Sequence, residues 1–422
     1  MNRPDIRRLP KRADPLQAQD LLLKLVREKS LPTEVVRLEE CLGRVLSKDA
    51  ISDLNIPSYD KTFIDGYAIN SEETKAASPS NPAAFRIVGK LFPADFPTAL
   101  QVRRGEAIYV ACGAPIPNGA SATVKVEETR LREGAIEVVR EIEMSEGIIP
   151  LGDDVKRGQL ILKKGQVLRP QDVGVLASLK MTRAEVFRKP VVSIISGGDE
   201  LLKQCQNNPA AIANNYALVV AGLASELGAA PKLVGIMPDA LEKVTEMIGK
   251  ALESSDVVVT IGGSSVGVKD FVPDAVNTFG KPGVVTQGVL LRPGAVSGFG
   301  IVDSKPVVML PGHIGSCIAG FFLFVAPLIG VLSGLDRSAV LPKVSAKISE
   351  DVKNGPQFRF LLVHLKRVNG KFVAEPTEGG SSALTTIVNS NGYAMISPHA
   401  ELEKDSDVDV FLFDKLEIAQ IP

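Results

Sequence analysis

Apolar runs alternate with helix-like stretches between Pro190 and Gly263. The order is VVSIIS, a helical pattern over 217–227, KLVGIM, a second helical pattern over 241–252, and DVVVTIGG. The strand-like runs are continuously apolar, as in strands buried on both faces of a parallel sheet that helices cover. The pattern therefore predicts a doubly wound α/β domain over 188–335, and ligands of such sheets bind at the carboxyl ends of the strands.

A second pattern precedes this domain. The segment DPLQAQDLLLKLV at 14–26 places apolar side chains at helical spacing after an Asp-Pro start, which predicts an amphipathic helix. A second short helix is predicted at 38–46. Short strand-like runs such as AIYVACG and ATVKVEE then follow one another between 51 and 143, separated by Gly, Pro and Asn, and they predict a β-rich domain.

Helical patterning returns in KKGQVLRPQDVGVLASLKM, after the β-rich stretch. We therefore expect 1–50 and 155–187 to form one discontinuous helical linker domain, with the β-rich domain inserted as 51–154. After Leu335 the strands RFLLVHLKRV, GYAMISP and DVDVFLF alternate with turn residues and predict a small barrel or sandwich. We take a β barrel over 336–422 as the expected fold, which makes the chain an α/β plus β multidomain protein.

Length, composition and charge narrow the class of protein. A chain of 422 residues exceeds what a single hydrophobic core usually organises. No uninterrupted apolar run reaches the roughly 20 residues that a bilayer crossing needs, and the basic start MNRPDIRRLPKR precedes no secretory apolar stretch. We expect a soluble, cytoplasmic protein with no membrane contact. The net charge of −1, without a long basic stripe, argues against nucleic acid as a partner.

Cysteine and histidine are too scattered to build a zinc site or a disulfide framework. The residues concerned are Cys41, Cys112, Cys205, Cys317, His313, His364 and His399. We expect reduced thiols, and any metal ion should sit on oxygen ligands.

Three glycine-bearing loops follow apolar strands of the α/β domain: ISGGDEL at 195–201, IGGSSVGVKDF at 261–271 and MLPGHIGSC at 309–317. Glycine lets the backbone approach a ligand closely, and the N–H groups of a following helix attract an oxyanion. Two loops also carry acids, Asp199 with Glu200 and then Asp270, which could hold Mg²⁺ against phosphate oxygens. Helix capping is the alternative role for these acids.

A second group of polar segments lies outside the α/β domain, in IPSYDKTFIDGYAI at 56–69, CGAPIPNGA at 112–120 and GDDV at 152–155. Asp65 stands in an otherwise apolar stretch, between Ile64 and Gly66. An unpaired buried carboxylate there would be costly, which implies a partner or a ligand. A turn or a cap explains Asp65 equally well.

Taken in order, these segments resemble the molybdopterin molybdenumtransferases. The motifs are DGYA after NIP-S-[FY]-D, GAPIP-x-GA, S-x-GDEL, GG-x-SVG-x-x-DF, R-PG and LPG, and the similarity runs from LEECLGRVL to GGSSALTTIVNSNGY. The chain is also similar to the C-terminal part of gephyrin. The resemblance implies an enzyme that takes adenylylated molybdopterin and molybdate, releases AMP and leaves molybdenum on the dithiolene sulfurs, usually with Mg²⁺. A molybdopterin adenylyltransferase and molybdoenzymes are the implied partners.

The resemblance also assigns roles to residues. The acids of the active cleft would be Asp65, Asp154, Glu200 and Asp270, of which Glu200 and Asp270 would hold the metal. The residues that bind the pterin compound and its phosphate would be Gly262, Gly263, Ser265, Gly267, Arg292, Pro311, Gly312, His313 and Cys112. In such proteins the β domain of one subunit faces the α/β domain of another, so a homodimer is implied.

Several positions depart from the family pattern. Cys112 replaces a threonine, Ala295 a lysine, and LPGHI an LPG-Asn-Pro signature, so that His313 and Ile314 are unusual. EGIIPLG at 146–152 lacks the usual arginine, and Ile212 stands near the place of an acid. These changes keep two alternatives open. One is a carrier or scaffold that binds the pterin without inserting metal, and the other is a nucleotide hydrolase built on the same α/β unit.

Two of the substituted residues have ordinary structural roles to be weighed. A lone cysteine after an apolar strand is more often a small buried hydrophobe than a metal-binding sulfur, so we expect Cys112 to be buried. His313 at a helix start could donate to an anion or cap the turn. The DGYA and GAPIP segments argue against the nucleotide hydrolase, because they lie outside the α/β unit.

Overall fold

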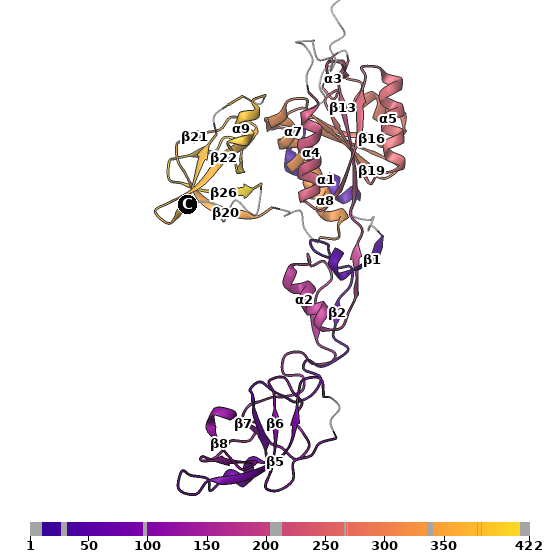
Figure 1. Cartoon of the computed structure of the whole chain (residues 1–422). Coiled ribbons are helices and arrows are strands. Elements are labelled where there is room, and N and C mark those ends of the chain that lie inside the picture. Colours follow the sequence, from indigo (N-terminus) through magenta and orange to yellow (C-terminus); the bar gives the residue numbers. More distant parts are fainter. Residues whose placement is uncertain are drawn as a thin grey trace, which may run out of the picture. The chain divides into compact units, whose positions relative to one another are not determined.

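A computed structural model describes residues 11–26, 32–95, 99–202, 213–265, 267, 269–335, 341–377, 379–380 and 382–413 (Figure 1). The chain divides into two compact units. The first comprises Met1–Val35, Gly43–Ser47 and Glu185–Pro422, and the second comprises Val36–Leu42 and Lys48–Ala184. Each unit has hydrophobic cores of its own.

The first unit contains a six-stranded sheet in the order β14-β13-β15-β19-β18-β16. The strands are β13 (Val191–Gly197), β14 (Ala230–Met237), β15 (Val257–Ile261), β16 (Gly283–Gln287), β18 (Gly298–Val302) and β19 (Lys305–Leu310). β14, β13, β15 and β19 run parallel, whereas β18 and β16 are antiparallel to their neighbours. The predicted parallel sheet is confirmed, with two antiparallel strands added at one edge.

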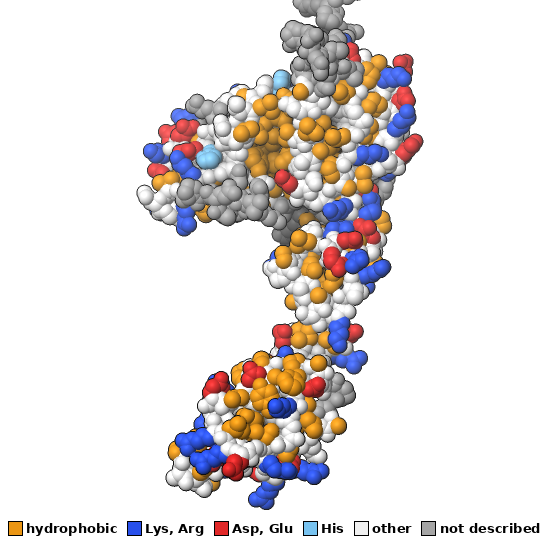
Figure 2. Space-filling view, viewed as in Figure 1, with side chains coloured by type: hydrophobic (Ala, Val, Ile, Leu, Met, Phe, Trp, Pro, Cys, Tyr) orange, Lys and Arg blue, Asp and Glu red, His pale blue; other side chains and the backbone are white. Residues whose placement is uncertain are grey.

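Helices cover both faces of this sheet. One face packs against α1 (Pro15–Val26), α4 (Asn215–Glu226), α7 (Ile314–Gly320), the π-helical segment η4 (Phe321–Val325) and α8 (Ala326–Leu332). The other face packs against α5 (Leu241–Glu253) and α6 (Val272–Thr278). α5 buries Val244 and Ile248, and Figure 2 shows charged side chains along its outer side. This is the doubly wound arrangement that the alternating pattern predicts.

The helical run Ile314–Leu332 passes through the core of the first unit. By length and composition it could cross a bilayer, but 94% of its apolar window is buried inside the fold. Packing against the sheet and α1 therefore accounts for its hydrophobicity. Within its π-helical turn, Leu323 O accepts a hydrogen bond from the side-chain amide of Gln19 in α1 at 2.6 Å.

The C-terminal part of the first unit is a closed barrel. Its strands follow the order β22-β23-β20-β26-β24, and a pairing of β24 with β22 closes the circle. The elements are β20 (Lys343–Ile348), β21 (Val352–Lys353), β22 (Phe358–Val368), β23 (Lys371–Pro376), α9 (Leu384–Val388), β24 (Gly392–Ile396), β25 (Glu401–Leu402) and β26 (Asp407–Leu412). The predicted barrel is confirmed.

A backbone pairing and an aromatic stack are among the contacts that join the barrel to the α/β part. β17 (Leu291–Arg292) pairs in parallel with the start of β22. Phe322 of the core helix stacks on Phe360 and Tyr393 of the barrel, with ring centroids 6.3 Å and 5.2 Å away. Phe411 and Phe413 extend the stack. Aromatic packing and a backbone pairing thus position the barrel beside the strand ends.

The second unit contains a six-stranded sheet in the order β7-β4-β6-β5-β9-β8. Its elements are β4 (Gly66–Ile69), η2 (Ser71–Thr74), β5 (Ala83–Leu91), β6 (Glu106–Val110), β7 (Ala122–Lys125), η3 (Val126–Glu128), β8 (Thr129–Arg132) and β9 (Ala135–Val138). Ile69, Phe85 and Ile136 are fully buried at its centre. The β-rich domain is confirmed.

The segments that flank the inserted sheet are held by short pairings. β1 (Thr33–Arg37) pairs with β12 (Arg183–Phe187), β2 (Ala50–Ile51) with β11 (Leu160–Leu162), and β3 (Lys61–Thr62) with β10 (Ile148–Ile149). α2 (Pro170–Ser178) follows β11, whereas α1 packs against α8 of the first unit. The division of the chain into four domains stays a prediction.

The helix predicted over 38–46 is wrong. Only one 3₁₀ turn, η1 (Leu38–Glu40), forms there, and it ends at Cys41. Gly43 follows with φ +73°, a left-handed conformation that a continuing helix does not allow. The apolar side chains of this segment, such as Val45 and Leu46, are buried although the backbone is not helical there.

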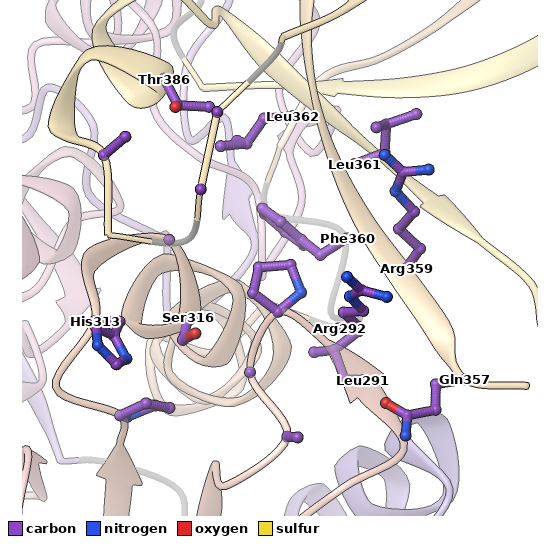
Figure 3. Close-up of a pocket in the computed structure, with 18 of the residues that line it drawn as sticks. Leu291, Arg292, His313, Ser316, Gln357, Arg359, Phe360, Leu361, Leu362 and Thr386 are labelled. Atoms are coloured by element: carbon purple, nitrogen blue, oxygen red, sulfur yellow. The ribbon is translucent and has the colours of Figure 1, made fainter. Parts of the chain in front are cut away.

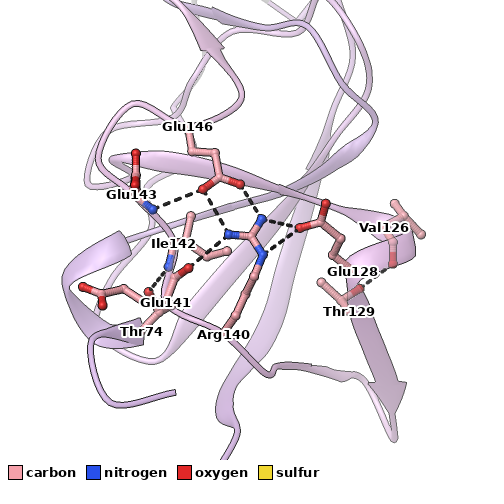
Figure 4. Close-up of polar contacts among 9 residues, drawn as sticks. All are labelled: Thr74, Val126, Glu128, Thr129, Arg140, Glu141, Ile142, Glu143 and Glu146. Carbon is pink, nitrogen blue, oxygen red and sulfur yellow. Dashed lines mark hydrogen bonds and ion pairs between the residues drawn. The ribbon is translucent and has the colours of Figure 1, made fainter. Parts of the chain in front are cut away.

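Arg140 organises the turn that leads to β10 (Figure 4). Its Nε donates to Glu128 Oε2 at 3.0 Å and its Nη1 donates to Glu146 Oε2 at 3.2 Å. Glu146 also accepts from the backbone N of Glu143 at 3.2 Å. The guanidinium of Arg140 holds the pKa of the Glu146 carboxyl below its ordinary value of 4.5. The three side chains clamp both ends of the turn together.

We predict that Arg140→Gln lowers the free energy of local opening of 140–149 by about 1 kcal/mol, a modest value because water screens these partly exposed groups. A carboxyl whose pKa is lower in the folded state stabilises the fold fully when the pH is above its pKa in the unfolded chain. That stabilisation is lost as the pH falls through its pKa in the folded state. Hydrogen exchange between pH 3 and pH 6 should therefore show an acid-dependent loss of protection in the wild type that Arg140→Gln lacks. Equal acid dependence in both proteins would contradict the clamp.

The side chain of Asn391 makes hydrogen bonds to the backbone of a barrel strand, in the place of a neighbouring strand's backbone groups. Its Oδ1 accepts from Leu365 N at 2.6 Å, and its Nδ2 donates to Leu365 O at 2.9 Å. Asn391 is buried, so both backbone groups of Leu365 depend on this side chain.

We predict that Asn391→Ala destabilises the barrel by roughly 2 kcal/mol, because it leaves a buried donor and a buried acceptor without partners. Asn389→Ala is the matched control, since Asn389 is exposed two positions away. Calorimetric unfolding of both variants checks the prediction, and equal transition temperatures would exclude the proposed role of Asn391.

Candidate active site at the strand ends

A cavity of about 680 Å³ lies at the carboxyl ends of the parallel strands. The turn after β13 contributes Ser196–Gly198, the turn after β15 contributes Ile261–Ser265, and the turn after β19 contributes Pro311–His313. We call this cavity the strand-end pocket. All three predicted glycine loops meet in it, as the parallel order of the strands requires.

Backbone conformation explains two of the glycines in this pocket. Gly262 and Gly263 have φ values of +83° and +69°, in the left-handed region that other residues rarely adopt. A Cβ on Gly263 would also stand 3.1 Å from a methyl group of Val272. The predicted residues Ser265, Pro311 and Gly312 line the same pocket. The turn therefore exposes its backbone to any ligand that lies there.

Asp270 lines the pocket and also closes its own turn. Its Oδ2 accepts from Gly267 N at 2.6 Å, so this predicted loop amide is directed at Asp270. The N-cap of α6 is Phe271, so Asp270 closes a turn and does not take the alternative role of a helix cap. Glu200 falls within α3 (Asp199–Leu202), and its side chain lies outside the described residues.

A further acid, Asp239, lines the pocket and was not predicted. It follows β14 directly, in MPDA, so an acid at a strand end was the signal that could have found it. Lys269 Nζ lies 3.1 Å from Asp239 Oδ2 and 3.8 Å from Asp199 Oδ2. Asp199 Oδ1 also accepts from Asp239 N at 3.2 Å. One ammonium group thus links three neighbouring strand-end turns.

A second cavity of about 730 Å³ adjoins the first and faces the barrel (Figure 3). We call it the barrel-side pocket. Val296, Pro311 and His313 line both cavities, so the two share a wall. Ala295, at a position where the family pattern has a lysine, lines the barrel-side pocket as well.

The barrel-side pocket is basic. Arg292, Lys353 and Arg359 line it, and none of the described residues that line it is an aspartate or a glutamate. Arg292 and Arg359 are register partners in the pairing of β17 with β22, and Figure 3 shows their side chains near each other. Sequence reasoning found Arg292 and missed Lys353 and Arg359, because β21 and β22, which carry them, come roughly 60 residues later, a separation that only tertiary pairing closes.

His313 occupies the N-cap position of α7, but its side chain makes no capping hydrogen bond. The alternative of a turn-capping histidine is therefore wrong. Its exposed side chain lies where the two pockets meet. Ile314, the neighbouring departure from the family pattern, is fully buried in the core. Ile212 lies outside the described residues.

The remaining predicted residues lie on loops of the second unit. Asp65 Oδ1 accepts from Cys112 N at 2.9 Å, which ties the start of β4 to the end of β6. Both residues are exposed, so the expected burial of Cys112 is wrong and Asp65 needs no buried partner. The partner of Asp65 is a turn amide. Cys317 is a buried free thiol, the thiol of Cys41 donates to Arg37 O at 3.2 Å, and Cys205 is outside the described residues.

Asp154 is exposed on a neighbouring loop, held by a hydrogen bond from its backbone N to Ile56 O at 3.0 Å. Leu151, in the segment where the family pattern has an arginine, is half exposed. The predicted site residues thus form two groups, one on the loops of the second unit and one at the two pockets of the first unit. Their convergence on one site stays a prediction.

Three family models match successive parts of the chain. Residues 14–179 match the model of the MoeA N-terminal region (domain I and II), 193–330 that of a probable molybdopterin binding domain, and 345–413 that of the MoeA C-terminal region (domain IV). Two solved structures of a molybdopterin biosynthesis MoeA protein from Pyrococcus horikoshii superpose with TM-scores of 0.83 and 0.79. Both are 28% identical to this chain and cover 96% and 95% of it, and 100% of their own length.

Curated relatives named molybdopterin molybdenumtransferase match the chain over most of their length. A molybdopterin molybdenumtransferase of Staphylococcus aureus (strain COL) is 30% identical over 391 residues, which are 92% of this chain and 90% of the relative. One of Staphylococcus epidermidis is 30% identical over 367 residues, 86% of this chain and 85% of the relative. The chain therefore belongs to the molybdopterin molybdenumtransferase family.

Proposed function

We propose that the protein inserts molybdenum, supplied as molybdate, into adenylylated molybdopterin and releases AMP. The observation that carries the proposal is the pairing of Arg292 opposite Arg359 in a pocket whose described lining has no carboxylate. Like charges directly opposite each other in a sheet repel. A tetrahedral oxyanion between the two guanidinium groups would turn that repulsion into charge-assisted hydrogen bonds.

Because the two pockets share a wall, we propose that one ligand extends into both of them. In this proposal the strand-end pocket holds the phosphate and pterin part, with the backbone at Gly262 and Gly263 and the hydroxyl of Ser265 as contacts. Pro311, Gly312 and His313 separate that part from the oxyanion beside Arg292. Transfer on a phosphate anhydride depends mainly on positioning and charge neutralisation, which these groups supply.

Mg²⁺ fits the acids of the strand-end pocket. Mg²⁺ is commonly bound by one or two carboxylates together with water and substrate phosphate. Asp270 offers one carboxylate in the described lining, and Glu200 is the second proposed ligand. When bound, the ion neutralises phosphate charge. Asp270 itself keeps the turn at Gly267 closed, so the ligand and the turn are fixed by the same side chain.

We further propose a homodimer in which the loops that carry Asp65, Cys112 and Asp154 complete the site of a second subunit. Their exposed polar groups and the half-exposed Leu151 suit a surface that covers a pocket. A molybdopterin adenylyltransferase would supply the substrate, and molybdoenzymes would receive the product in the cytoplasm.

One incubation tests the activity. Purified full-length protein is mixed with adenylylated molybdopterin, molybdate and Mg²⁺, and AMP release is followed together with retention of molybdenum. Both signals are expected. Binding without AMP release would replace the proposal with a carrier role, and AMP release from an unrelated nucleotide without pterin binding would indicate a nucleotide hydrolase.

We predict that Arg359→Met raises the KM for molybdate at least about tenfold, because one charge-assisted hydrogen bond to the oxyanion is lost. Thermal stability should stay the same or rise, since a like-charge pair is removed. Arg367→Met, at an exposed position of the same strand, is the control and should leave the KM unchanged. Equal KM values for both variants would remove the barrel-side pocket from the reaction.

We predict that Asp65→Ala and Asp270→Ala each abolish turnover and change stability by less than about 1 kcal/mol, as expected for exposed or half-exposed turn acids. Refolding an equal mixture of the two variants should restore about a quarter of wild-type activity. About half of the dimers would then contain one subunit of each variant, and in each of these dimers one of the two sites would have both aspartates intact. No recovery in a mixture that forms mixed dimers would contradict a site shared between subunits.

A further inference from the structure

Asn214 has an unusual place at the strand-end pocket. It occupies the N-cap position of α4, where asparagine ordinarily accepts a hydrogen bond from the first turn of the helix, yet its side chain makes no capping bond. Its Oδ1 instead accepts the hydroxyl hydrogen of Ser196, at 2.7 Å. Ser196 is 1% exposed and stands at the end of β13. The helix therefore lacks a stabilising cap that Asn214 is chemically able to provide.

This hydrogen bond sets the orientation of the amide. Because Oδ1 is occupied by the Ser196 hydroxyl, the Nδ2 group remains as a pair of donors. Among the residues that the structure describes, Nδ2 has no hydrogen-bond partner, and Asn214 lines the strand-end pocket half-buried. The amide thus offers donors beside the glycine turns that surround the cavity.

The fold itself does not require a partner for the Ser196 hydroxyl. In the same sheet Ser193 of β13 and Thr260 of β15 are fully buried, and their hydroxyl groups have no partner among the described residues. The sheet thus tolerates two unpaired hydroxyl groups in its core. What the bond from Ser196 adds is one fixed orientation of the Asn214 amide.

We infer that Ser196 is a positioning residue that holds the Asn214 amide with its Nδ2 donors directed at an acceptor of the bound pterin compound. The acceptor is an oxygen or a ring nitrogen, since Nδ2 can only donate. This inference rests on the proposed function, because it takes the strand-end pocket as the site for adenylylated molybdopterin. Ser196 acts on the ligand through Asn214.

A double-mutant cycle tests this role. The dissociation constant for adenylylated molybdopterin is measured without molybdate for the wild type, Ser196→Ala, Asn214→Ala and the double variant. Each single substitution should raise it about tenfold, as the loss of one hydrogen bond to a ligand does. If Ser196 acts only through Asn214, the double variant should bind no more weakly than Asn214→Ala.

Ser193→Ala is the matched control. It removes a buried serine hydroxyl from the same strand, three positions away, and should leave the dissociation constant unchanged. Thermal unfolding of all variants reports any general loss of structure. Equal dissociation constants for Ser196→Ala and Ser193→Ala would overturn the inference, and so would additive effects of the Ser196 and Asn214 substitutions.

The readout keeps this inference separate from the proposed activity. A wild-type protein that binds the pterin compound but releases no AMP would fail as a molybdenum insertase, while the coupling between Ser196 and Asn214 would still appear in the dissociation constants. Failure of the wild type to bind adenylylated molybdopterin would overturn the positioning role. The positioning role is supported if the Ser196 and Asn214 substitutions are coupled in binding, if kcat/KM falls to a matching extent, and if the stability of the variants is unchanged.

Discussion

The parallel order of β14, β13, β15 and β19 is the constraint on which the rest of the site depends. Parallel strands place their carboxyl ends at one edge of the sheet, so turns that are far apart in the chain become neighbours. The left-handed turn at Gly262 and Gly263 can form there because glycine has no Cβ to obstruct it. Asp239 and Asp270 of the strand-end pocket lie on segments that follow β14 and β15, so this edge of the sheet sets their positions.

A second constraint is electrostatic. Arg292 and Arg359 come from different parts of the first unit and are brought together by the pairing of β17 with β22. Stacking of Phe322 on Phe360 supports that pairing from the core side. The hydrophobic contact therefore stabilises a concentration of positive charge that the sheet alone would disfavour. A pocket lined by basic side chains is the chemical consequence of this packing.

Sequence reasoning succeeded where local patterns decide structure and failed where burial or distance decides it. Continuous apolar runs that alternate with helical patterns predicted the α/β part, because such runs occur in strands with both faces buried. Short alternating strands separated by turn residues predicted the final barrel. The helix over 38–46 was wrong, since apolar spacing alone does not show that Gly43 turns the chain. The expected burial of Cys112 was wrong because a strand pattern does not reveal where the strand ends and the exposed loop begins.

By itself the sequence determined the order of elements, the glycine turns, the acid at Asp270 and the membership of a molybdenumtransferase family, because each is written in residues that are close together in the chain. Only the tertiary structure decided that Arg359 stands opposite Arg292, that Asp239 and Lys269 join neighbouring turns, and that Ser196 donates to Asn214. These pairings join residues 18 to 67 positions apart, so they exist only once the sheet and the barrel have packed.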